Sequence, residues 1–376
     1  MSTTTKVLLG CGIALFAGLI LLAIGGFALY RLAIAPSTKM PAALNTPGIV
    51  QGAGFVNCRE FFRDPRLGGV TDIRFAELDT RPGRELGIAG VNGAVFLDPG
   101  GKVNSWVTFS DTGRHVDLVD VENDGICEFM GRGSWSDSAV LMDHSGKRIW
   151  EYGGSDGVDD MAAGDMNGDG RLEFVVGFNG GGGVHLLNTN GTMQWRQSDG
   201  NVWHVEITDT DGNGTNEIVH SNAGGSMVVM DKTGSVISSG SSSGYFSGFS
   251  LCQWPTKKDR LYALSAEGNA VWILNFNGSS AARFDAPNAG DLGEARGVPI
   301  KLQQSAPEYL AVVVNLDQWD RSLLYIYDRS GKLRYQEVLG ESCPSIAAIP
   351  DAKSVTDILL VGGQSRVLQY SIPANP

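Results

Sequence analysis

Apolar and polar residues alternate in short runs along most of the chain, and one such run returns at a nearly constant interval. It consists of an apolar stretch ending in Asp or Asn, then two residues, then Gly. Alternation of period two predicts strands, and the polar residue with Gly predicts a tight turn between two of them. Successive anchor residues are 45, 45, 43, 44 and 53 positions apart: Asp98, Asp143, Asn188, Asp231, Asn275 and Asp328.

Two further strand-like runs precede each predicted hairpin, so that each repeat contains four strands and no long stretch of helical period. Four strands in 40–45 residues is the period of a β-propeller blade. We therefore predict an all-β, seven-bladed propeller of four-stranded antiparallel blades, with eight blades as the alternative. The last blade lacks a fourth strand, which residues 54–62 can supply. The predicted blades are 70–109, 114–153, 158–198, 201–241, 245–287, 295–340 and 343–372.

The N-terminal region has a different pattern. Residues 7–30 are uncharged and mostly apolar, long enough to cross a bilayer as one helix. A signal-peptidase site at 33–35 and a lipobox at 8–11 are alternatives, but the length of the apolar run and its position relative to Cys11 favour an uncleaved anchor. The predicted organisation is a tail (1–6), a transmembrane helix (7–30), a linker (31–52) and a propeller (53–376).

Composition narrows the functional classes. Glycine accounts for 51 of 376 residues, about twice the usual ~7%, as expected of many tight turns. The 42% hydrophobic content is too high for a disordered chain. A formal net charge of −12 opposes binding to phosphate backbones, so we expect no nucleic-acid partner.

Much of the acidic excess lies in three loops, each between the first and second predicted strands of a blade. Each loop has oxygen-bearing side chains at positions one, three, five and nine and Gly at position six. The main-chain carbonyl oxygen of position seven would be a further ligand of the cation. The expected ligands are Asp120, Glu122, Asp124, Ile126 and Glu128 in blade 2, Asp165, Asn167, Asp169, Arg171 and Glu173 in blade 3, and Asp209, Asp211, Asn213, Thr215 and Glu217 in blade 4.

This donor pattern suits a hard cation with six to eight oxygen ligands, and therefore Ca²⁺ better than Mg²⁺. We predict structural Ca²⁺ in blades 3 and 4, with blade 2 as a third site. Blade 1 is expected to keep only Asp79, as position one. An EF-hand is excluded because its loop has twelve residues and flanking helices. The alternative is ordinary turn chemistry, since Asp, Asn and Gly all favour tight turns.

The segment AAGDMNGDGRLEFVVG resembles the FG-GAP (integrin α-subunit-like, or VCBS) propeller repeat. The specific motif is present only in blades 2–4, with Glu rather than the usual Asp at position nine. The resemblance implies calcium-braced propellers that are usually extracytoplasmic and often act in adhesion or carbohydrate-related contexts. It implies no particular activity.

A second candidate site lies where the inner strands begin, at the end opposite the acidic loops. Five residues before each first acid, the same register contains Arg74, His115, Asp160 and His204. We call this end of the predicted ring the mouth. Tryptophans on or beside its loops could stack on sugars: Trp135, Trp203 and Trp319. The alternative is that these polar residues are simply solvated or hydrogen-bonded. Trp106, Trp150 and Trp195 have the blade period and are expected in the core.

No nucleophile elbow, zincin motif or phosphate loop occurs, so no catalytic residue is assigned. Cys58, Cys127, Cys252 and Cys343 allow three disulfide pairings or free thiols. We predict a single-pass membrane protein with an extracytoplasmic propeller that binds a protein or a glycan. The alternatives are a polysaccharide lyase or hydrolase that uses the mouth, and a purely structural scaffold.

Overall fold

The computed structural model describes residues 40–373 except for short gaps. It divides the chain into two compact units, residues 1–45 and 46–376, which are described separately. In the first unit the described part contains one 3₁₀ turn, η1 (Ala42–Leu44). The predicted transmembrane segment 7–30 lies outside the described residues, and no helix within them has the length and apolar composition to cross a bilayer. The gaps are 80–82, 110–113, 134–137, 155, 242–247, 254–260, 291–292, 303–307 and 352–354.

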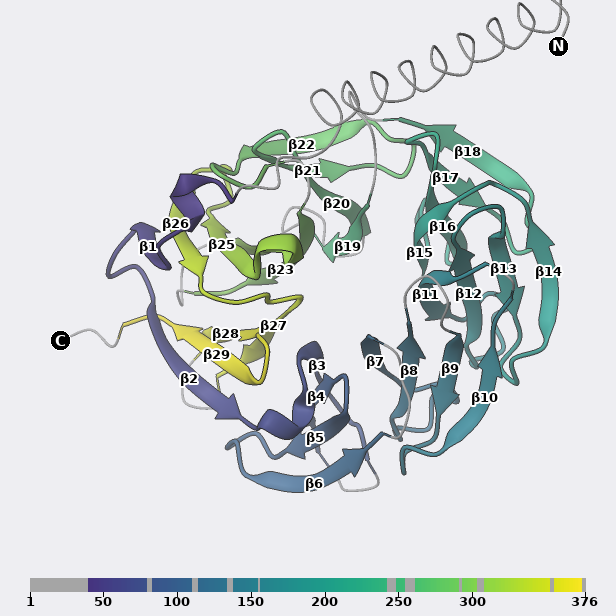
Figure 1. Cartoon of the computed structure of the whole chain (residues 1–376), viewed down its shortest axis with the longest axis horizontal. Coiled ribbons are helices and arrows are strands. Elements are labelled where there is room, and N and C mark those ends of the chain that lie inside the picture. The colour runs from purple at the N-terminus through teal and green to yellow at the C-terminus, as the bar shows by residue number, and fades with distance from the viewer. Residues whose placement is uncertain are drawn as a thin grey trace, which may run out of the picture. The chain divides into compact units, whose positions relative to one another are not determined.

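The second unit is a ring of seven antiparallel sheets, which confirms the seven-bladed propeller over the eight-bladed alternative. Figure 1 shows the blades following one another around the ring in chain order. Blade 1 contains β3 (Val70–Ala76), β4 (Glu85–Gly90), β5 (Gly93–Leu97) and β6 (Val103–Thr108). Blade 2 contains β7 (His115–Val119), β8 (Glu128–Arg132), β9 (Ala139–Met142) and β10 (Arg148–Tyr152). Blade 3 contains β11 (Val158–Gly164), β12 (Glu173–Phe178), β13 (Gly183–Leu187) and β14 (Met193–Gln197).

The remaining blades continue the same order from the inner to the outer strand. Blade 4 contains β15 (Val202–Thr208), β16 (Glu217–Asn222), β17 (Met227–Met230) and β18 (Val236–Gly240). Blade 5 contains β19 (Ser250–Gln253), β20 (Leu261–Glu267), β21 (Ala270–Leu274) and β22 (Ser280–Asp285). Blade 6 contains β23 (Glu294–Ile300), β24 (Tyr309–Leu316), β25 (Arg321–Tyr327) and β26 (Leu333–Leu339). Blade 7 contains β27 (Ser345–Pro350), β28 (Asp357–Gly362) and β29 (Arg366–Ser371). Two other 3₁₀ turns are η2 (Pro65–Leu67) and η3 (Asp317–Trp319).

The N-terminal part of the ring closes blade 7. Strand β2 (Asn57–Arg63) pairs antiparallel with β29 as the outer strand, at the place where the sequence suggests a closing strand over 54–62 (Figure 1). The inner strands of blades 7 and 1 then contact each other, so the ring is closed at this junction.

Blade 6 has an additional strand that the repeat pattern does not predict. Strand β1 (Gly48–Gln51) pairs antiparallel with the outer edge of β26, which makes this blade five-stranded (Figure 1). The predicted linker 31–52 is therefore wrong at its C-terminal end, where four residues belong to a sheet. An outer blade edge in this ring can accept a further strand.

The hairpin anchors have a local physical cause. The carbonyl of Asp143 accepts the N–H of Gly146 at 2.8 Å, and its carboxylate accepts the N–H groups of Ser145 and Lys147 at 2.9 and 3.0 Å. Gly146 has φ +80°, a conformation that is costly for other residues. An Asp or Asn followed three residues later by Gly therefore determines the turn.

Neighbouring blades are held together by side chains of the outer strands and by cores between the sheets. Trp150 donates its indole N–H to the Thr189 carbonyl in the next blade at 3.2 Å, and Trp195 does the same to Lys232 at 2.8 Å. Apolar clusters fill the interfaces, for example Val176 and Phe178 of blade 3 with Leu141 of blade 2. Trp106, Trp150 and Trp195 pack against these clusters.

Candidate functional site

The three acidic loops share one backbone conformation. Each begins directly after an inner strand and ends at the Glu that opens the second strand. The carboxylate at position one accepts the N–H of the Gly at position six, at 2.9 Å in blades 2 and 3 and 2.7 Å in blade 4. These glycines have φ of +81° to +86°, which explains why Gly occupies position six.

The Glu at position nine turns back into the loop. In all three loops it accepts the N–H of position two: Val121 at 3.0 Å, Met166 at 2.9 Å and Thr210 at 2.9 Å. Burial, together with the nearby Asp124 and Asp120 carboxylates, raises the pKa of Glu128 to about 7. Burial and the neighbouring carboxylates also raise the pKa of Glu173. A bound cation would relieve this repulsion.

Blade 1 contains a fourth loop of the same length, and its register differs from the predicted one. Strand β3 ends at Ala76 and Glu85 opens β4, where Glu85 accepts the N–H of Leu78 at 3.1 Å. The residue at position one is therefore Glu77, and Asp79 stands at position three. The prediction that Asp79 holds position one is wrong by two residues.

The loops differ in how well they fit a cation. In blade 4, carboxylate oxygens of Asp209, Asp211 and Glu217 lie within 4.8 Å of one another. In blade 3, the amide nitrogen of Asn167 lies 2.9 Å from Glu173, so its oxygen would have to turn inward to bind a metal. In blade 2, Glu122 forms an ion pair with Arg171 at 2.7 Å. The donor set of blade 4 fits Ca²⁺ best.

The residues expected at the mouth form an ion network across blades 2 to 4. Arg132 forms ion pairs with Asp117 at 2.7 Å and with Asp160 at 2.8 Å. His115 lies 2.9 Å from Asp117, and His204 lies 3.4 Å from Asp160. The side chains of Asp160 and Arg132 are only 10% and 13% exposed. The structure therefore unites His115, Asp160 and His204, with Asp117 and Arg132 added.

The charges in this network hold each other ionised. Burial alone would raise the pKa of Asp160, but the Arg132 and His204 charges outweigh it and lower the pKa to about 2. Burial opposes protonation of His204, but its bond to Asp160 raises the His204 pKa. The enzyme hypothesis requires Arg or carboxylate partners near the histidines, and these are present. They bind one another, however, which favours a structural role.

Arg74 does not stand at the strand position that His115, Asp160 and His204 share, five residues before position one of the following loop. Strand β3 contains an irregularity between Val70 and Asp72 in its pairing with β4. With Glu77 as position one, the residue equivalent to His115 is Asp72, which accepts the Leu118 N–H at 3.0 Å. Trp203 lies in β15 and Trp319 in η3, both half-buried, whereas Trp135 lies outside the described residues.

Glu206 of β15 lies beside this network. No hydrogen bond or ion pair within the described part of the chain holds its carboxylate. Burial and the Asp160 charge raise the pKa of Glu206 to about 7, against about 4.3 for a free Glu. The free energy of unfolding therefore falls as the pH rises from about 4 to 7, because the unfolded chain releases this proton more readily than the folded protein.

We expect Glu206→Gln to stabilise the protein at pH 8, by an amount on the order of 2 kcal/mol, because the amide removes this cost. The gain should disappear near pH 4, where the native carboxyl is already protonated. Denaturant midpoints at the two pH values measure the effect. Glu151→Gln on the exposed part of β10, away from this network, is the control and should not stabilise the protein at pH 8. Equal behaviour of the two variants would contradict the prediction.

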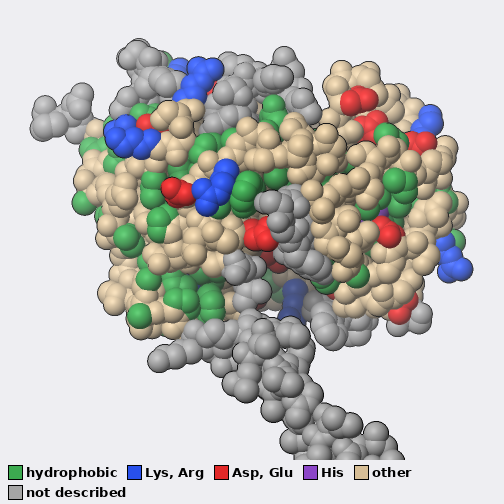
Figure 2. All heavy atoms as spheres, turned by 90° about the horizontal axis from the view of Figure 1, so that it is seen from above, with side chains coloured by type: hydrophobic (Ala, Val, Ile, Leu, Met, Phe, Trp, Pro, Cys, Tyr) green, Lys and Arg blue, Asp and Glu red, His purple; other side chains and the backbone are tan. Residues whose placement is uncertain are grey.

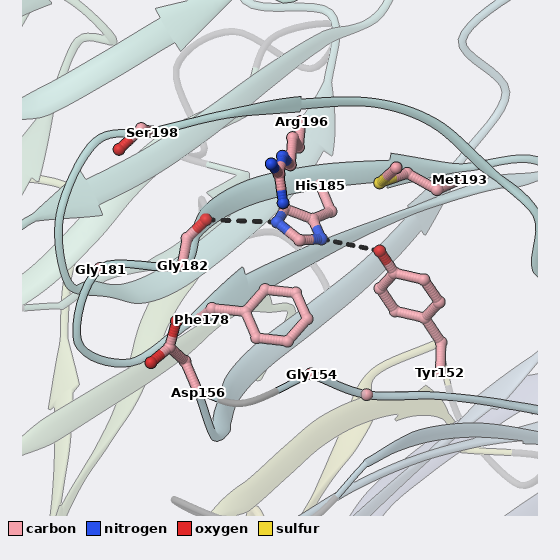
Figure 3. A pocket seen from close by; sticks show the side chains of 11 residues that line it. Tyr152, Gly154, Asp156, Phe178, Gly181, Gly182, His185, Met193, Arg196 and Ser198 are labelled. Atoms are coloured by element: carbon pink, nitrogen blue, oxygen red, sulfur yellow. Dashed lines mark hydrogen bonds between the residues drawn. The ribbon is translucent and has the colours of Figure 1, made fainter.

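A hollow of about 540 Å³ lies between the outer parts of blades 2 and 3 (Figure 3). The Tyr152 hydroxyl and Nδ1 of His185 are 2.8 Å apart, and Nε2 of His185 lies 3.2 Å from the Gly182 carbonyl. Because a carbonyl only accepts, Nε2 carries the proton and the tyrosine donates to Nδ1. Burial and the nearby Arg196 lower the pKa of His185, so its ring is neutral at pH 7.

This hollow could not be predicted from the sequence, because its walls come from three separate segments of the chain. Tyr152 and Asp156 follow or end β10, Phe178 and His185 lie on β12 and β13, and Arg196 lies on β14. Phe178 packs on His185 with ring centroids 4.4 Å apart. Figure 3 shows Arg196 and Asp156 on opposite sides of these rings. No motif brings such residues together in the sequence.

The four cysteines of the propeller form no disulfide. Cys58, Cys127, Cys252 and Cys343 are all free, so none of the three possible pairings forms. Burial raises the pKa of Cys127 and of Cys252 to about 12, so both are inert thiols.

On the face shown in Figure 2, acidic and basic side chains are interspersed with apolar ones rather than gathered in a basic stripe.

Comparisons with known proteins identify the fold. No family model and no curated protein sequence matches the chain. A crystal structure of BBS1N in complex with ARL6DN, soaked with lead, superposes with a TM-score of 0.55 at 11% identity, covering 85% of this chain and 98% of that one. The mercury-soaked form gives 0.57 with the same identity and coverage. The Pan2 WD40 domain of Neurospora crassa gives 0.48 at 12% identity, covering 90% and 98%. At such identities, the likeness to BBS1N establishes a propeller fold and nothing finer.

Proposed function

We propose that this protein is a membrane-anchored β-propeller that acts as an extracytoplasmic interaction module, with protein as its partner and Ca²⁺ as a structural brace. The observation that carries the proposal is the closed seven-bladed ring. BBS1N, whose fold superposes on this chain, was crystallised in complex with ARL6DN. Within the described residues, His115, Asp117, Arg132, Asp160 and His204 of the mouth are bound to one another, which favours a structural role for them over catalysis.

The acidic loops support the Ca²⁺ brace. In blade 4, Asp209, Asp211 and Glu217 would hold the ion, with Asn213 and the Thr215 carbonyl completing the oxygen set. Bound Ca²⁺ would neutralise carboxylates that otherwise repel one another. The loops also connect blades, since Leu172 of the blade 3 loop donates its N–H to the Val121 carbonyl of the blade 2 loop at 3.0 Å. Bracing one loop therefore stabilises its neighbour.

The apolar segment 7–30 supports the anchor, since it has the length of a bilayer-spanning helix. The charges that flank it are nearly balanced, so they do not determine the orientation. The extracytoplasmic assignment rests on the proposed Ca²⁺ sites, because structural Ca²⁺ modules outside the cell work with dissociation constants of about 10⁻⁴–10⁻³ M and are filled there. A C-terminal reporter that is active only outside the cytoplasm should be active. An active cytoplasmic reporter would contradict the assignment.

Chemical cross-linking in intact membranes tests the interaction role. We expect the full chain to form cross-links from propeller lysines to one or a few proteins, identified by mass spectrometry. Residues 1–52 fused to a fluorescent protein control for contacts made by the anchor alone. Cross-links no more numerous or specific than those of this control would contradict a role as an interaction module.

A further inference from the structure

The outer edge of blade 3 has a free side. Strand β14 pairs with β13 on one side, and within the described residues no strand pairs with its other side. The free N–H and C=O groups of such an edge can pair with an additional strand. The ring itself provides an example, since β1 occupies the equivalent edge of β26 in blade 6.

Unlike a bare edge, β14 is flanked by a hollow on each face. The 540 Å³ hollow lies on the blade 2 side and includes Met193 and Arg196. A second hollow of about 220 Å³ lies on the blade 4 side and includes Gln197. Ser198 lines both, so the hollows meet at the C-terminal end of the strand. Side chains of an added strand alternate between faces, so successive residues would enter the two hollows in turn.

The two hollows differ in chemistry. Arg196 forms no ion pair in the described part of the chain, and it lies on β14 itself, where an added strand would place a side chain directly opposite. An opposite charge at that place is favoured, because cross-strand neighbours lie about 5 Å apart. The second hollow has an apolar part, lined by Val228, Met230 and the 58% exposed Val236, and a polar part that includes Asp199 and Asn222. An apolar side chain fits there.

We propose that the free edge of β14 binds an extended peptide segment of a protein partner by strand addition. An acidic side chain of the peptide pairs with Arg196, and the adjacent apolar side chain enters the hollow beside Val236. Main-chain hydrogen bonds supply affinity, and the two hollows supply specificity. The inference rests on the proposed role as a protein-interaction module and names the surface and the kind of segment that it takes.

Fluorescence anisotropy with labelled peptides tests the proposal on the full chain in mild detergent. The probe is the nonapeptide Ser-Thr-Val-Glu-Val-Glu-Val-Thr-Ser, capped at both ends. One comparison peptide has Lys in place of both Glu residues, and another has Pro in place of the central Val. We expect saturable binding of the Glu peptide, roughly fivefold weaker binding of the Lys peptide, and none of the Pro peptide, which lacks a main-chain donor.

Two pairs of variants locate the site. Arg196→Glu should reverse the preference between the Glu and Lys peptides, whereas Arg148→Glu on the exposed part of β10 should not. Ser198→Trp should abolish binding by filling the junction of the hollows, whereas Ser105→Trp on β6 should have no effect. Hydrogen exchange should show peptide-dependent protection of residues 193–197. No saturable binding of any peptide, or equal effects of the two members of either pair, would overturn the proposal.

The cross-linking experiment separates this inference from the proposed function. If partners cross-link equally to the native chain and to Ser198→Trp, the interaction role stands and the β14 site is wrong. If the native chain captures no partner beyond the anchor control, the proposed function itself fails, whatever the peptides do.

Discussion

We expect Asp160→Ala to lower the free energy of unfolding by about 3–5 kcal/mol, the range seen when one partner of a buried ion pair is removed. Asp160 accepts from Arg132 at 2.8 Å and from the Val205 N–H at 3.0 Å, and it lies beside His204. These groups belong to blades 2, 3 and 4, so the substitution leaves the buried Arg132 guanidinium with Asp117 as its one remaining ion-pair partner and loosens two blade interfaces. For a ring of this size, the melting temperature should fall by roughly 5 °C.

The pH dependence distinguishes this explanation from a simple packing defect. The pKa of Asp160 lies at about 2 in the folded protein, below its value of about 3.9 in the unfolded chain. Its stabilising contribution is therefore present above pH 4 and is lost as the pH falls toward 2. Asp160→Asn, which keeps the shape but not the charge, should be destabilised at pH 7 and approach the native protein near pH 2.5. A constant difference across this range would contradict the electrostatic explanation.

Features with a local cause could be predicted from the sequence. A turn such as that at Asp143 needs only one side-chain oxygen and a Gly three residues later, so its repeat marks the blades. The acidic loops of blades 2 to 4 are equally local, because the carboxylate of position one accepts the N–H of position six and that of position nine accepts the N–H of position two. Pattern and structure agree here because the determining contacts lie within nine residues.

Features that depend on distant contacts could not be predicted. Arg132 stands at the end of β8, and only the assembled ring brings it to Asp160 in the next blade. Strand β1 is only four residues long and follows a Pro-rich stretch, so its pairing with β26, almost 300 residues away in the chain, leaves no periodic signal. Position one of the blade 1 loop could not be assigned correctly for a different reason. Glu77 stands there, whereas the loops of blades 2 to 4 have Asp at that position.

Removal of Ca²⁺ should also lower the stability of the folded protein. If Ca²⁺ binds the blade 4 loop, then free Ca²⁺ at 100 to 1,000 times its dissociation constant stabilises the folded protein by about 3–4 kcal/mol for each site. We therefore expect chelation to lower the melting temperature by roughly 5 °C, with recovery on adding Ca²⁺ and little recovery with Mg²⁺, which fits this many protein oxygens poorly. Calorimetric scans of the full chain with chelator, Ca²⁺ or Mg²⁺ measure these shifts.

Substitutions within blade 4 assign the effect to the loop. The double variant Asp209→Asn, Asp211→Asn removes two charges from the donor set with little change in shape, and it should abolish most of the Ca²⁺-dependent shift. Asp231→Asn is the matched control, because Asp231 caps the hairpin of the same blade by accepting the Thr233 and Ser235 N–H groups at 2.8 and 3.0 Å. That variant should keep the full shift. A Ca²⁺ response that is absent from the native chain, or that survives the double substitution unchanged, would show that the blade 4 loop is held by its own hydrogen bonds and needs no ion.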